Sequence, residues 1–459
     1  MAPADLLQQQ KAHYATGATR SFEARRDALR SLLQGLERLQ GELITALHAD
    51  LGKGAVEAYS SELFVVIGEA RHAMANLKRW MKPVHHRVPF LAWPGRGRVD
   101  REPCGAVLII GPWNYPLQLL LTPLVGVLAA GGTAVLKPSE HAPQVAAVIA
   151  RLIAESFRPG HVAVACGDVA VSEGLLRERF DHIFFTGSAP TARKVMSAAA
   201  SNLTPVTLEL GGKCPVLVFP GKDGRLSESL EVIARRIAWG KYLNAGQTCV
   251  APDHVLVASE HHDPLVEALG KAFRSFGLQD HARMVNRHHY ERVKAFLRDG
   301  RPVHGGGYDD DAFRIDPTVL IDVRPDAPVM QEEIFGPILP VLACAGPDAA
   351  LAQLRSLPAP LALYAFTKNR ELMDRILTDT TSGGVCFNDT VVHITGQSMP
   401  FGGVGESGMG RYRGRASFDT FTRERIVVKR PLWIDLPFRY PPPKLSVERL
   451  KALVRFLTR

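Results

Sequence analysis

The stretch AVLIIGPWNYPLQLLLTPLVGVLAAGGTAVLKPSE, residues 106–140, indicates the fold more directly than any other part of this 459-residue chain. Two short apolar runs, 106–111 and 133–137, flank an apolar segment at 117–130 that ends at a pair of glycines. The span Leu117 to Leu136 is long enough to cross a bilayer, but its glutamine, proline and glycine pair favour a buried helix followed by a buried strand. Continuous apolar strands are typical of parallel sheets that are covered on both faces.

The same alternation of strands and helices continues on both sides of this stretch. Leucines at helical spacing predict helices over residues 21–80, and residues 97–104 alternate like a half-exposed strand. A second series runs from about Thr204 to Val392 and includes the strand candidates VTLEL, CPVLVF, HVLVA and GGVCFN. Further elements of the first series are predicted as strands at 162–167 and 182–187 and helices at 143–157 and 171–179. The pattern predicts an α/β fold with two domains built on parallel sheets.

Composition and charge narrow the classes of function. The chain is 46% hydrophobic and 22% charged, as in ordinary globular proteins, and its formal net charge is +9. The basic residues are spread along the chain, so we expect no nucleic-acid partner; an anionic dinucleotide and weak lipid contact fit better. The six cysteines are far apart, without a CxxC pair, which favours a reducing, cytoplasmic compartment and no disulfide framework. The N-terminus lacks the pattern of a signal peptide, and no metal site is predicted.

Three polar residues stand where a catalyst would need them. Cys249 lies in the turn-like segment NAGQTCVAP, where a substrate can reach a thiolate. Glu209 ends the apolar strand of VTLELGGK and is suited to activating water for hydrolysis of a thioester. Asn114 in GPWNYP follows the first strand, and its amide can donate to an oxyanion. Each alone also fits an ordinary role: an inert buried thiol, an edge-of-sheet salt bridge, and a turn asparagine.

Two further segments fit a nucleotide. In FFTGS an apolar strand leads through Gly187 and Ser188 into a helix with a proline near its start, and such a helix N-terminus can hold a pyrophosphate. Lys137 and Glu140 in LKPSE follow the second strand and can bond ribose hydroxyls; a surface lysine is the alternative interpretation of Lys137.

Together these motifs resemble those of the aldehyde dehydrogenase superfamily. GPWNYP, LKPSE, FFTGS, LELGGK, GQTC, QEEIFGP and PFGGVGESGMG occur in that family's order and spacing, over residues 20–440. Cys249 follows Glu209 by 40 residues. The short N-terminus, RRIAWGKYLNAGQTCVAPD and the RYPPP near the end are similar to the class 3 branch, which includes dimeric and fatty aldehyde dehydrogenases.

The resemblance implies a division of the chain. It implies a Rossmann-like parallel-sheet cofactor domain, a second α/β catalytic domain and a small β arm that pairs the subunits of a homodimer. We expect these parts at 1–81 with 104–207, at 208–395, and at 82–103 with 396–435, followed by a C-terminal tail at 436–459.

The resemblance also implies a reaction and a set of site residues. Cys249 would attack an aldehyde, Asn114 would stabilise the oxyanion, and Glu209 would activate the water that hydrolyses the thioester. Among the cofactor residues, Glu333 would bond the nicotinamide ribose beside Phe335, and Glu140 favours NAD because a carboxylate repels a 2′-phosphate, although NADP stays open. The cofactor-binding residues implied are Trp113, Lys137, Glu140, Gly187, Ser188, Glu333, Phe335 and Phe401.

Substrate and alternatives are less determined. The class 3 resemblance favours apolar aliphatic or aromatic aldehydes, with Tyr115, Leu243 and Ile394 either as channel walls or as core residues. One alternative is a CoA-acylating aldehyde dehydrogenase, against which Glu209 argues, and another is a family member that has lost catalysis. Three positions depart from the family pattern: Ala192 where a glycine is common, Cys214 where a small polar residue is usual, and Glu406 where an asparagine is common.

The C-terminal segment KLSVERLKALVRFLTR has apolar residues at helical spacing: Leu450, Leu453, Val454 and Leu457. Lys451, Arg455 and Arg459 supply its basic charge. We expect this helix to pack on the partner subunit; the alternative is an interfacial helix that places the protein at the periphery of a membrane.

Overall fold

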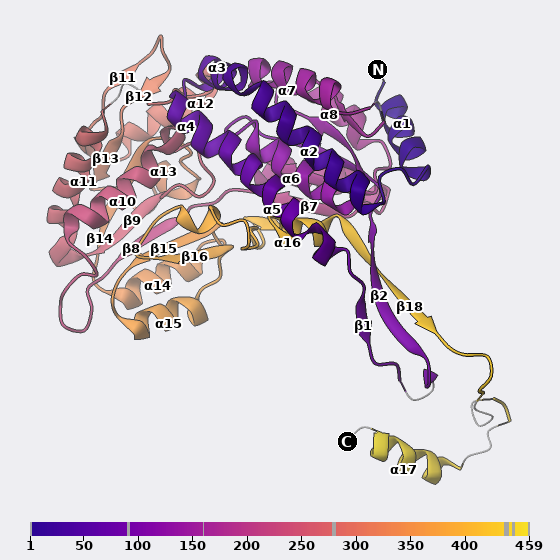
Figure 1. Ribbon diagram of the computed structural model, residues 1–459. Coiled ribbons are helices and arrows are strands. Elements are labelled where there is room, and N and C mark those ends of the chain that lie inside the picture. The colour runs from indigo at the N-terminus through magenta and orange to yellow at the C-terminus, as the bar shows by residue number, and fades with distance from the viewer. Residues whose placement is uncertain are drawn as a thin grey trace.

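The N-terminal segment is helical, and its later helices cover one face of a sheet. The computed structural model describes residues 2–89, 92–158, 160–277, 281–435, 440–442 and 446–457 (Figure 1). Leu29, Leu32, Leu36, Leu43 and Leu47 are fully or almost fully buried, which confirms the helical spacing predicted for 21–80. The helical elements are α1 (Pro3–Ala15), α2 (Phe22–Arg38), α3 (Gln40–Leu51), α4 (Ala55–Ala58), the π-helical turn η1 (Tyr59–Leu63) and α5 (Phe64–Trp80).

The first sheet has six strands in the order β17-β7-β6-β3-β4-β5. All neighbouring pairs are parallel except β17 on β7. One core joins the sheet to α2, α5, α6 and α7, and a second core joins its other face to α1, α8 and α9. The elements are β3 (Ala106–Ile110), α6 (Gln118–Ala130), β4 (Thr133–Lys137), α7 (Pro143–Ser156), β5 (Val162–Val164), α8 (Val169–Leu176), β6 (His182–Thr186), α9 (Ala189–Ser201), β7 (Val206–Glu209) and β17 (Gly408–Met409).

The apolar stretch from Leu117 to Leu136 forms a buried helix and a buried strand, as predicted. Every residue of α6 is buried, and Gly131, with φ of 84°, ends the helix in the left-handed region before β4 begins. Glycine has no Cβ to oppose that conformation. Within the described part of the chain, no helix combines the length and apolar character needed to span a bilayer.

The second sheet has seven strands in the order β10-β13-β14-β9-β8-β15-β16, all parallel except β10 on β13. Its faces are covered by α10 and α11 on one side and by α14 and α15 on the other. The strands are β8 (Pro215–Val218), β9 (His254–Ala258), β10 (Arg301–His304), β13 (Thr318–Ile321), β14 (Ile338–Cys344), β15 (Ala362–Phe366) and β16 (Gly384–Phe387). The α-helices are α10 (Leu230–Tyr242), α11 (His262–Phe276), α12 (Arg287–Ala295), α13 (Pro328–Gln331), α14 (Pro347–Ser356) and α15 (Arg370–Asp379).

Short elements join these layers. The 3₁₀ turns are η3 (Leu243–Gly246), η4 (Ser259–His261), η5 (Phe296–Arg298) and η6 (Val392–Ile394), and β11 (Tyr308–Asp309) pairs with β12 (Arg314–Ile315). The helix α16 (Arg415–Thr420) packs on α6 of the first domain. Figure 1 shows the two sheets side by side, with the second domain on the left.

A separate antiparallel arm projects from the body (Figure 1). It consists of β1 (Val84–His86), β2 (Arg96–Pro103) and β18 (Thr422–Lys429), with β2 between the other two. The strand predicted at 97–104 is therefore confirmed. Ile426 and Val428 on β18 are 78% and 51% exposed, so the arm carries apolar side chains that the single chain leaves uncovered.

The sheet topology differs from the predicted division in two places. The VTLEL strand belongs to the first sheet, because β7 pairs with β6, and the change of domain falls after Glu209 rather than at 207/208. The pair Gly211-Gly212, with φ of 147° at Gly212, carries the chain between the sheets. The link between the two sheets is only a few residues long and does not look like a domain linker in the sequence. The position of the domain boundary was therefore not apparent from the sequence. Similarly, β17 within 396–435 completes the first sheet and is not part of the arm.

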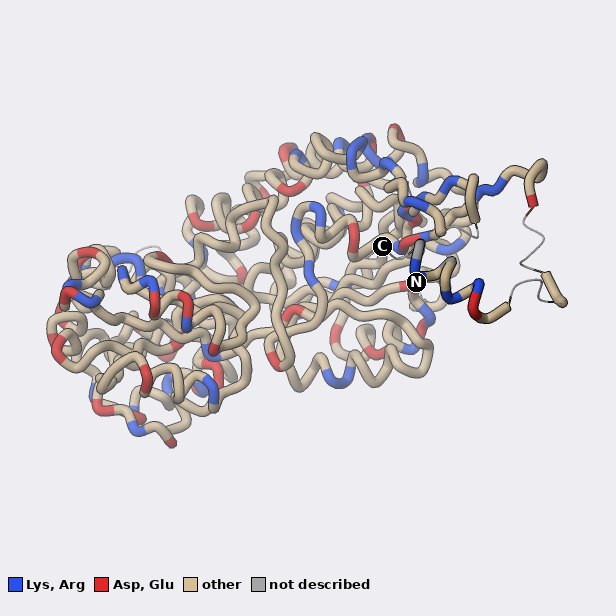
Figure 2. Tube along the Cα trace, turned by 90° about the horizontal axis from the view of Figure 1, so that it is seen from below, with Lys and Arg blue, Asp and Glu red and all other residues tan. Residues whose placement is uncertain are grey.

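The C-terminal segment forms α17 (Val447–Leu457), as the periodicity predicted. Leu450 and Val454 are 50% and 49% exposed. The side chains of Leu453 and Leu457, residues 443–445 of the proline-rich stretch and Arg459 lie outside the described residues. In Figure 1 the helix lies on the side of the arm, away from both sheets. Lys and Arg are distributed over the whole chain and interleaved with Asp and Glu (Figure 2).

Candidate active site

The loop that carries Cys249 has an unusual backbone. After α10, Asn244, Ala245 and Gly246 have φ of 51°, 52° and 71°, three consecutive residues in the left-handed region. A Cβ at position 246 would overlap the carbonyl oxygen of Gly336, which lies just before β14. The loop can therefore approach this segment only because residue 246 is a glycine. Such backbone strain is typical of functional sites.

The glutamine of the GQTC motif supports this loop from inside. Gln247 is completely buried. Its Nε2 donates to the carbonyl oxygens of Asn244 and Arg283, each at 3.0 Å, and its Oε1 accepts from the amide of Val285 at 3.2 Å. A fully satisfied buried amide of this kind fixes the backbone on both sides of it. The loop therefore presents Cys249 in one defined position.

Cys249 is half-buried and packs against the core of the second domain. Burial raises the pKa of its thiol to about 12, and the charges of Glu333 and Glu209 add to that increase, while Arg413 opposes it. The protein alone thus holds this cysteine as a neutral thiol. A thiolate requires a change in the charges around it.

Asn114 reaches the Cys249 loop from the first sheet. It follows β3, is 3% exposed, and its Nδ2 donates to the carbonyl oxygen of Gln247 at 3.0 Å. An amide group has two N–H donors, so one remains for another acceptor. The preceding Trp113 packs edge-on against Phe335, with ring centroids 5.4 Å apart. The sequence-predicted residues 113, 114 and 335 therefore lie at the same junction.

Glu209 is the last residue of β7 and lies between β6 and β17, opposite Thr186 and Gly408. Its side chain is buried, and neither carboxylate oxygen has a hydrogen-bond partner among the described residues. Burial raises the pKa of Glu209 well above its usual range, against the opposing charges of Arg413 and Arg411. An unpaired buried carboxyl with a raised pKa has the properties of a general base.

Glu333 lies in the loop after α13. Burial and the charge of Asp253 raise its pKa to about 8, and its Oε1 has no partner among the described residues. A Cβ at position 211 would overlap this carboxylate, so the LELGGK glycine makes room for it. Asp253, which is paired with Lys213, accepts the amide of Ile334 at 3.0 Å and fixes the backbone next to Glu333. An orphaned carboxylate oxygen at a fixed position is what a hydroxyl ligand would satisfy.

Four predicted cofactor residues lie at the carboxyl ends of the first sheet. Lys137 ends β4, is buried, and donates to Glu140 Oε2 at 3.1 Å and to the carbonyl oxygen of Pro138 at 2.9 Å. Burial raises the pKa of Glu140, but its backbone and Lys137 outweigh that effect, so the net direction is downward. The amide of Gly187 donates to the carbonyl oxygen of Glu209 at 3.0 Å. Ser188 is the exposed N-terminal cap of α9.

Comparison with known proteins is consistent with this geometry. The model of the aldehyde dehydrogenase family matches residues 5–427. The chain belongs to the aldehyde dehydrogenase family. Its reaction class is therefore the NAD(P)-dependent oxidation of an aldehyde, and the relatives place it in class 3.

Two relatives and one solved structure illustrate the similarity. The chain is 40% identical over 453 residues to 4,4′-diaponeurosporen-aldehyde dehydrogenase of Staphylococcus aureus, with 97% of each chain covered. It is 43% identical to human aldehyde dehydrogenase family 3 member B1, covering 98% of this chain and 96% of that protein. The substrate-bound structure of Staphylococcus aureus AldH superposes with a TM-score of 0.94 at 39% identity, covering 98% and 99% of the two chains. The α/β fold with Rossmann-like sheets is thereby confirmed.

Phe401 joins the two halves of this aldehyde dehydrogenase. It packs against the cores of both domains and forms a two-way backbone bridge with Tyr412, each hydrogen bond being 2.9 Å. The ring centroids of the two residues are 5.9 Å apart. Phe401 is thus placed where the family motif PFGG crosses between the domains.

Three candidate substrate residues lie close to the cysteine loop. Tyr115 is 5% exposed, and its hydroxyl is 2.7 Å from Thr248 Oγ1. Leu243 and Ile394 are partly buried against the same core as Cys249. These contacts fit both the channel-wall and the core interpretation of the three residues.

The three departures from the family pattern have local explanations. Ala192 is buried in the core behind α9. Cys214 is fully buried, its Sγ 3.3 Å from the carbonyl oxygen of Cys249 and from the amide of Ala362, so it supports the cysteine loop from behind. Glu406 forms an exposed ion pair with Arg193 at 2.6 Å. All six cysteines are free.

Four charged residues near the site were missed in the sequence. Arg413 is 4% exposed, has φ of 77°, and its charge acts on both Glu209 and Cys249. Its guanidinium lies 5.6 Å from the Phe401 ring and donates to the carbonyl oxygen of Ile394 at 2.6 Å. Nothing in the surrounding GMGRYRGR distinguishes this arginine from its two partly buried neighbours, Arg411 and Arg415. Lys53, Glu57 and Glu62 precede the sheet by some fifty residues and gave no motif.

Proposed function

We propose that Cys249 is the nucleophile of this aldehyde dehydrogenase, that Asn114 stabilises the oxyanion, and that Glu209 activates the hydrolytic water. One observation supports this most strongly: residues from three separate elements interact around the Cys249 loop. Asn114 bonds the cysteine loop through Gln247, and the Glu209 charge acts on the Cys249 thiol. A nucleophile, an amide donor and an orphaned carboxyl are the parts that acyl-thiol chemistry needs.

The cycle follows from these positions. The Cys249 thiolate attacks the aldehyde carbon, a C–S bond forms, and the carbonyl oxygen becomes an oxyanion. The second N–H of Asn114 and the backbone amide of Cys249 donate to that oxygen. Departure of hydride from the same carbon converts the adduct into a thioester; bound NAD(P) supplies the hydride acceptor. Glu209 then takes a proton from water, the water oxygen attacks, the C–S bond breaks, and the acid leaves.

The residues of the chain fit NAD. The unpaired Oε1 of Glu333 has the character needed to accept a ribose hydroxyl, and Phe335 and Trp113 form an aromatic wall next to it. Lys137 and Glu140 would bind the second ribose, with Gly187 and Ser188 near the phosphates and Phe401 at the nicotinamide end. A Mycobacterium tuberculosis aldehyde dehydrogenase complexed with NAD+ is 25% identical, with a TM-score of 0.83 and 95% and 92% of the chains covered. Glu140 favours NAD, and NADP is the alternative.

We further propose an apolar substrate that passes Tyr115, Leu243 and Ile394. Leu243 and Ile394 are partly exposed and pack against the same hydrophobic core as Cys249. The named Staphylococcus aureus relative acts, by its name, on 4,4′-diaponeurosporen-aldehyde. Medium or long aliphatic aldehydes and aromatic aldehydes are the chemical classes that fit such walls.

For assembly, we propose a cytoplasmic homodimer joined through the arm. The strands β1 and β18 are the edges of the arm sheet, and β18 exposes Ile426 and Val428. Unpaired edges with apolar side chains are suited to pairing with a second copy. The helix α17, with its exposed Leu450 and Val454, would pack on that partner. Liposome flotation of the full chain against a chain ending at Lys444 separates this from peripheral membrane binding, in which only the full chain floats.

The decisive experiment is NADH formation at 340 nm with a panel of aldehydes, with and without CoA, for wild type, Cys249→Ala and Glu209→Gln. We expect CoA-independent turnover that Cys249→Ala abolishes and that Glu209→Gln slows after the first turnover. Turnover that requires CoA would favour the acylating alternative. NAD binding without turnover under any condition would favour a chain that has lost catalysis.

A further inference from the structure

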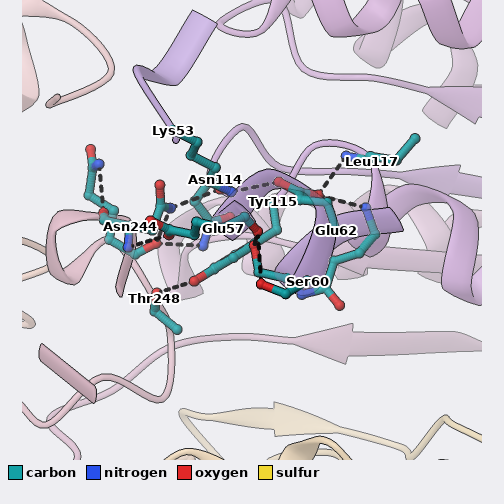
Figure 3. Close-up of polar contacts among 12 residues, drawn as sticks. Lys53, Glu57, Ser60, Glu62, Asn114, Tyr115, Leu117, Asn244 and Thr248 are labelled. Carbon is teal, nitrogen blue, oxygen red and sulfur yellow. Dashed lines mark hydrogen bonds and ion pairs between the residues drawn. The ribbon is translucent and has the colours of Figure 1, made fainter. Parts of the chain in front are cut away.

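A buried ion pair lies behind the loop that carries Asn114. Lys53, between α3 and α4, and Glu62, in the π-helical turn η1, both have fully buried side chains, with Lys53 Nζ 2.6 Å from Glu62 Oε1. The same ammonium donates to the carbonyl oxygen of Asn114 at 2.9 Å and lies 3.9 Å from the centre of the Tyr115 ring (Figure 3). The ammonium group of Lys53 thus contacts the Glu62 carboxylate and two adjacent residues of the loop, Asn114 and Tyr115.

The second oxygen of Glu62 holds the other end of that loop. Oε2 accepts the amides of Leu117 and Gln118 at 3.2 and 2.9 Å. These amides belong to the first turn of α6, whose N-terminal capping position is Leu117, a residue without a capping side chain. Glu62 supplies the missing cap from another element, and its negative charge matches the positive end of the helix. The loop from Asn114 to Leu117 is therefore fixed at both ends by one ion pair.

The same N-terminal segment also reaches the cysteine loop. Glu57 Oε1 accepts the amide of Asn244 at 2.7 Å, where the left-handed turn begins. Asn244 Nδ2 in turn donates to the carbonyl oxygens of Asn114 and Gln247, at 2.8 and 3.1 Å. Figure 3 shows Lys53, Glu57 and Glu62 arranged around Asn114, Tyr115 and Asn244.

We propose that the Lys53–Glu62 pair is a positioning device for the catalytic step: through the carbonyl oxygen of Asn114 it holds the Asn114 amide at the place where the oxyanion forms. The proposal rests on the oxyanion role assigned to Asn114 above. A buried ion pair contributes little net stability compared with an apolar pair of similar shape, because desolvation offsets the attraction. Its geometry, however, is exacting, and an oxyanion donor must be placed to within a fraction of an ångström. The Lys53–Glu62 pair therefore fixes the position of the Asn114 amide, which an apolar pair of similar shape would not do.

Substitutions separate positioning from stability. Lys53→Met removes the bond to Asn114, and Lys53→Met/Glu62→Gln also removes the stranded carboxylate, while the side-chain carbonyl of the introduced glutamine can still accept the α6 amides. The matched control is Arg25→Met: Arg25 is 5% exposed and donates to the carbonyl oxygen of Ala129, at the opposite end of α6. Its loss destabilises the same helix without touching the loop. Asn114→Ala, alone and with Lys53→Met, completes the set.

The readouts are the rate constant of the first turnover of NADH formation, at saturating NAD and aldehyde, and the melting temperature. For Asn114→Ala we expect a loss of about 10²–10³-fold, the effect of one oxyanion donor. Lys53→Met should lose at least about tenfold, and adding it to Asn114→Ala should change the rate less than twofold, because both act through one amide. The double variant Lys53→Met/Glu62→Gln should regain melting temperature but stay slow, while Arg25→Met should melt lower and keep its first turnover.

Three outcomes would overturn the proposal. The first is a Lys53→Met/Glu62→Gln enzyme, which folds without a stranded charge, whose first turnover equals that of Arg25→Met. The second is multiplication of the Lys53→Met and Asn114→Ala losses in the combined variant. The third is an Asn114→Ala variant whose first-turnover rate constant equals that of wild type, which would exclude the oxyanion role of Asn114 itself. This outcome is distinguished from the first two because the variant leaves Lys53 unchanged.

Discussion

The free enzyme should keep its proposed nucleophile, Cys249, in the unreactive thiol form, and the pH dependence of alkylation measures this. Burial and the charges of Glu333 and Glu209 raise the pKa of Cys249 to about 12. At pH 8 only about one molecule in ten thousand would then carry the thiolate, whereas an ordinary cysteine with a pKa of about 8.5 would be about one quarter ionised. Because thiolate is the reactive form, we expect the alkylation rate of Cys249 without cofactor to be lower by roughly three orders of magnitude.

The slope of the pH profile tests the same reasoning without reference to an absolute rate. Between pH 6.5 and 9.5 the rate for a thiol with a pKa of about 12 should rise by about tenfold per pH unit, or about 1,000-fold in total. An ordinary cysteine should rise only about 90-fold over this range and level off at its upper end. Iodoacetamide labelling followed by peptide mass spectrometry measures the Cys249 profile. The exposed Cys166, whose pKa is itself raised by partial burial, is labelled in the same sample and serves as an accessible reference rather than as an ordinary cysteine.

Glu333 adds a second, independent signature. Its own pKa is about 8, so its charge opposes the thiolate mainly above that pH. Glu333→Gln should therefore accelerate labelling of Cys249 by about threefold to tenfold at pH 9.5 and have little effect at pH 6.5. The exposed neighbour Glu332 provides the matched control Glu332→Gln. A profile for Cys249 that levels off below pH 9 in the free enzyme would refute the argument that burial governs this thiol.

Three other perturbations follow from the site. Burial raises the Glu333 pKa from 4.5 to about 8, so this group stabilises the fold at low pH and that contribution is lost as pH rises through 8. The melting temperature of Glu333→Gln relative to wild type should therefore increase from pH 5 to pH 9. A difference that stays constant over this range would contradict the argument. Gly246→Ala should lower both the melting temperature and the first-turnover rate, since its Cβ overlaps Gly336, whereas Gly224→Ala, with φ of 73° and no atom within 4 Å, should show only the backbone cost of about 1–2 kcal/mol. Equal losses in the two variants would exclude the overlap. Arg413→Gln should move the pH–rate profile to higher pH, because the Arg413 charge lowers the pKa of Glu209 and Cys249, while Arg413→Lys and the exposed Arg193→Gln should leave it nearly unchanged.

The sequence predicted elements well where local pattern and tertiary environment agree. The apolar runs of β3, β4 and β6 are buried on both faces, so a continuous apolar pattern identified them. The division into sheets was less accessible. β7 and β8 are separated by a few residues around Gly211, and only the pairing of β7 with β6 shows that the first strand belongs to the other sheet. Strand pairing between distant segments leaves no trace in a single sequence.

The site residues divide in the same way. The resemblance of the sequence motifs to those of the aldehyde dehydrogenase family identified Cys249, Glu209 and Asn114. The roles of these residues are predictions that the experiments above test. Arg413 could not be found by pattern, since its importance depends on being buried beside two acids rather than on its neighbours in the chain. Lys53 likewise gave no signal, because a lysine in a short loop is normally solvated. A buried charge becomes visible only when the surrounding packing is known.

Burial has opposite consequences for the two groups that the proposed cycle uses in turn. For Glu209 burial raises the pKa and so favours the protonated carboxyl, which strengthens this group as a proton acceptor. For Cys249 the same burial suppresses the form that must attack. The positive charge of Arg413 opposes both shifts but does not cancel them. Activation of the thiol therefore needs a further positive charge or the loss of a negative one beside Glu333, and a cationic nicotinamide bound there would supply the first. The order of events, cofactor before aldehyde, would then follow from electrostatics alone: alkylation of Cys249 by iodoacetamide should be faster with NAD bound, despite the space that NAD occupies, and slower labelling at every pH would contradict this order.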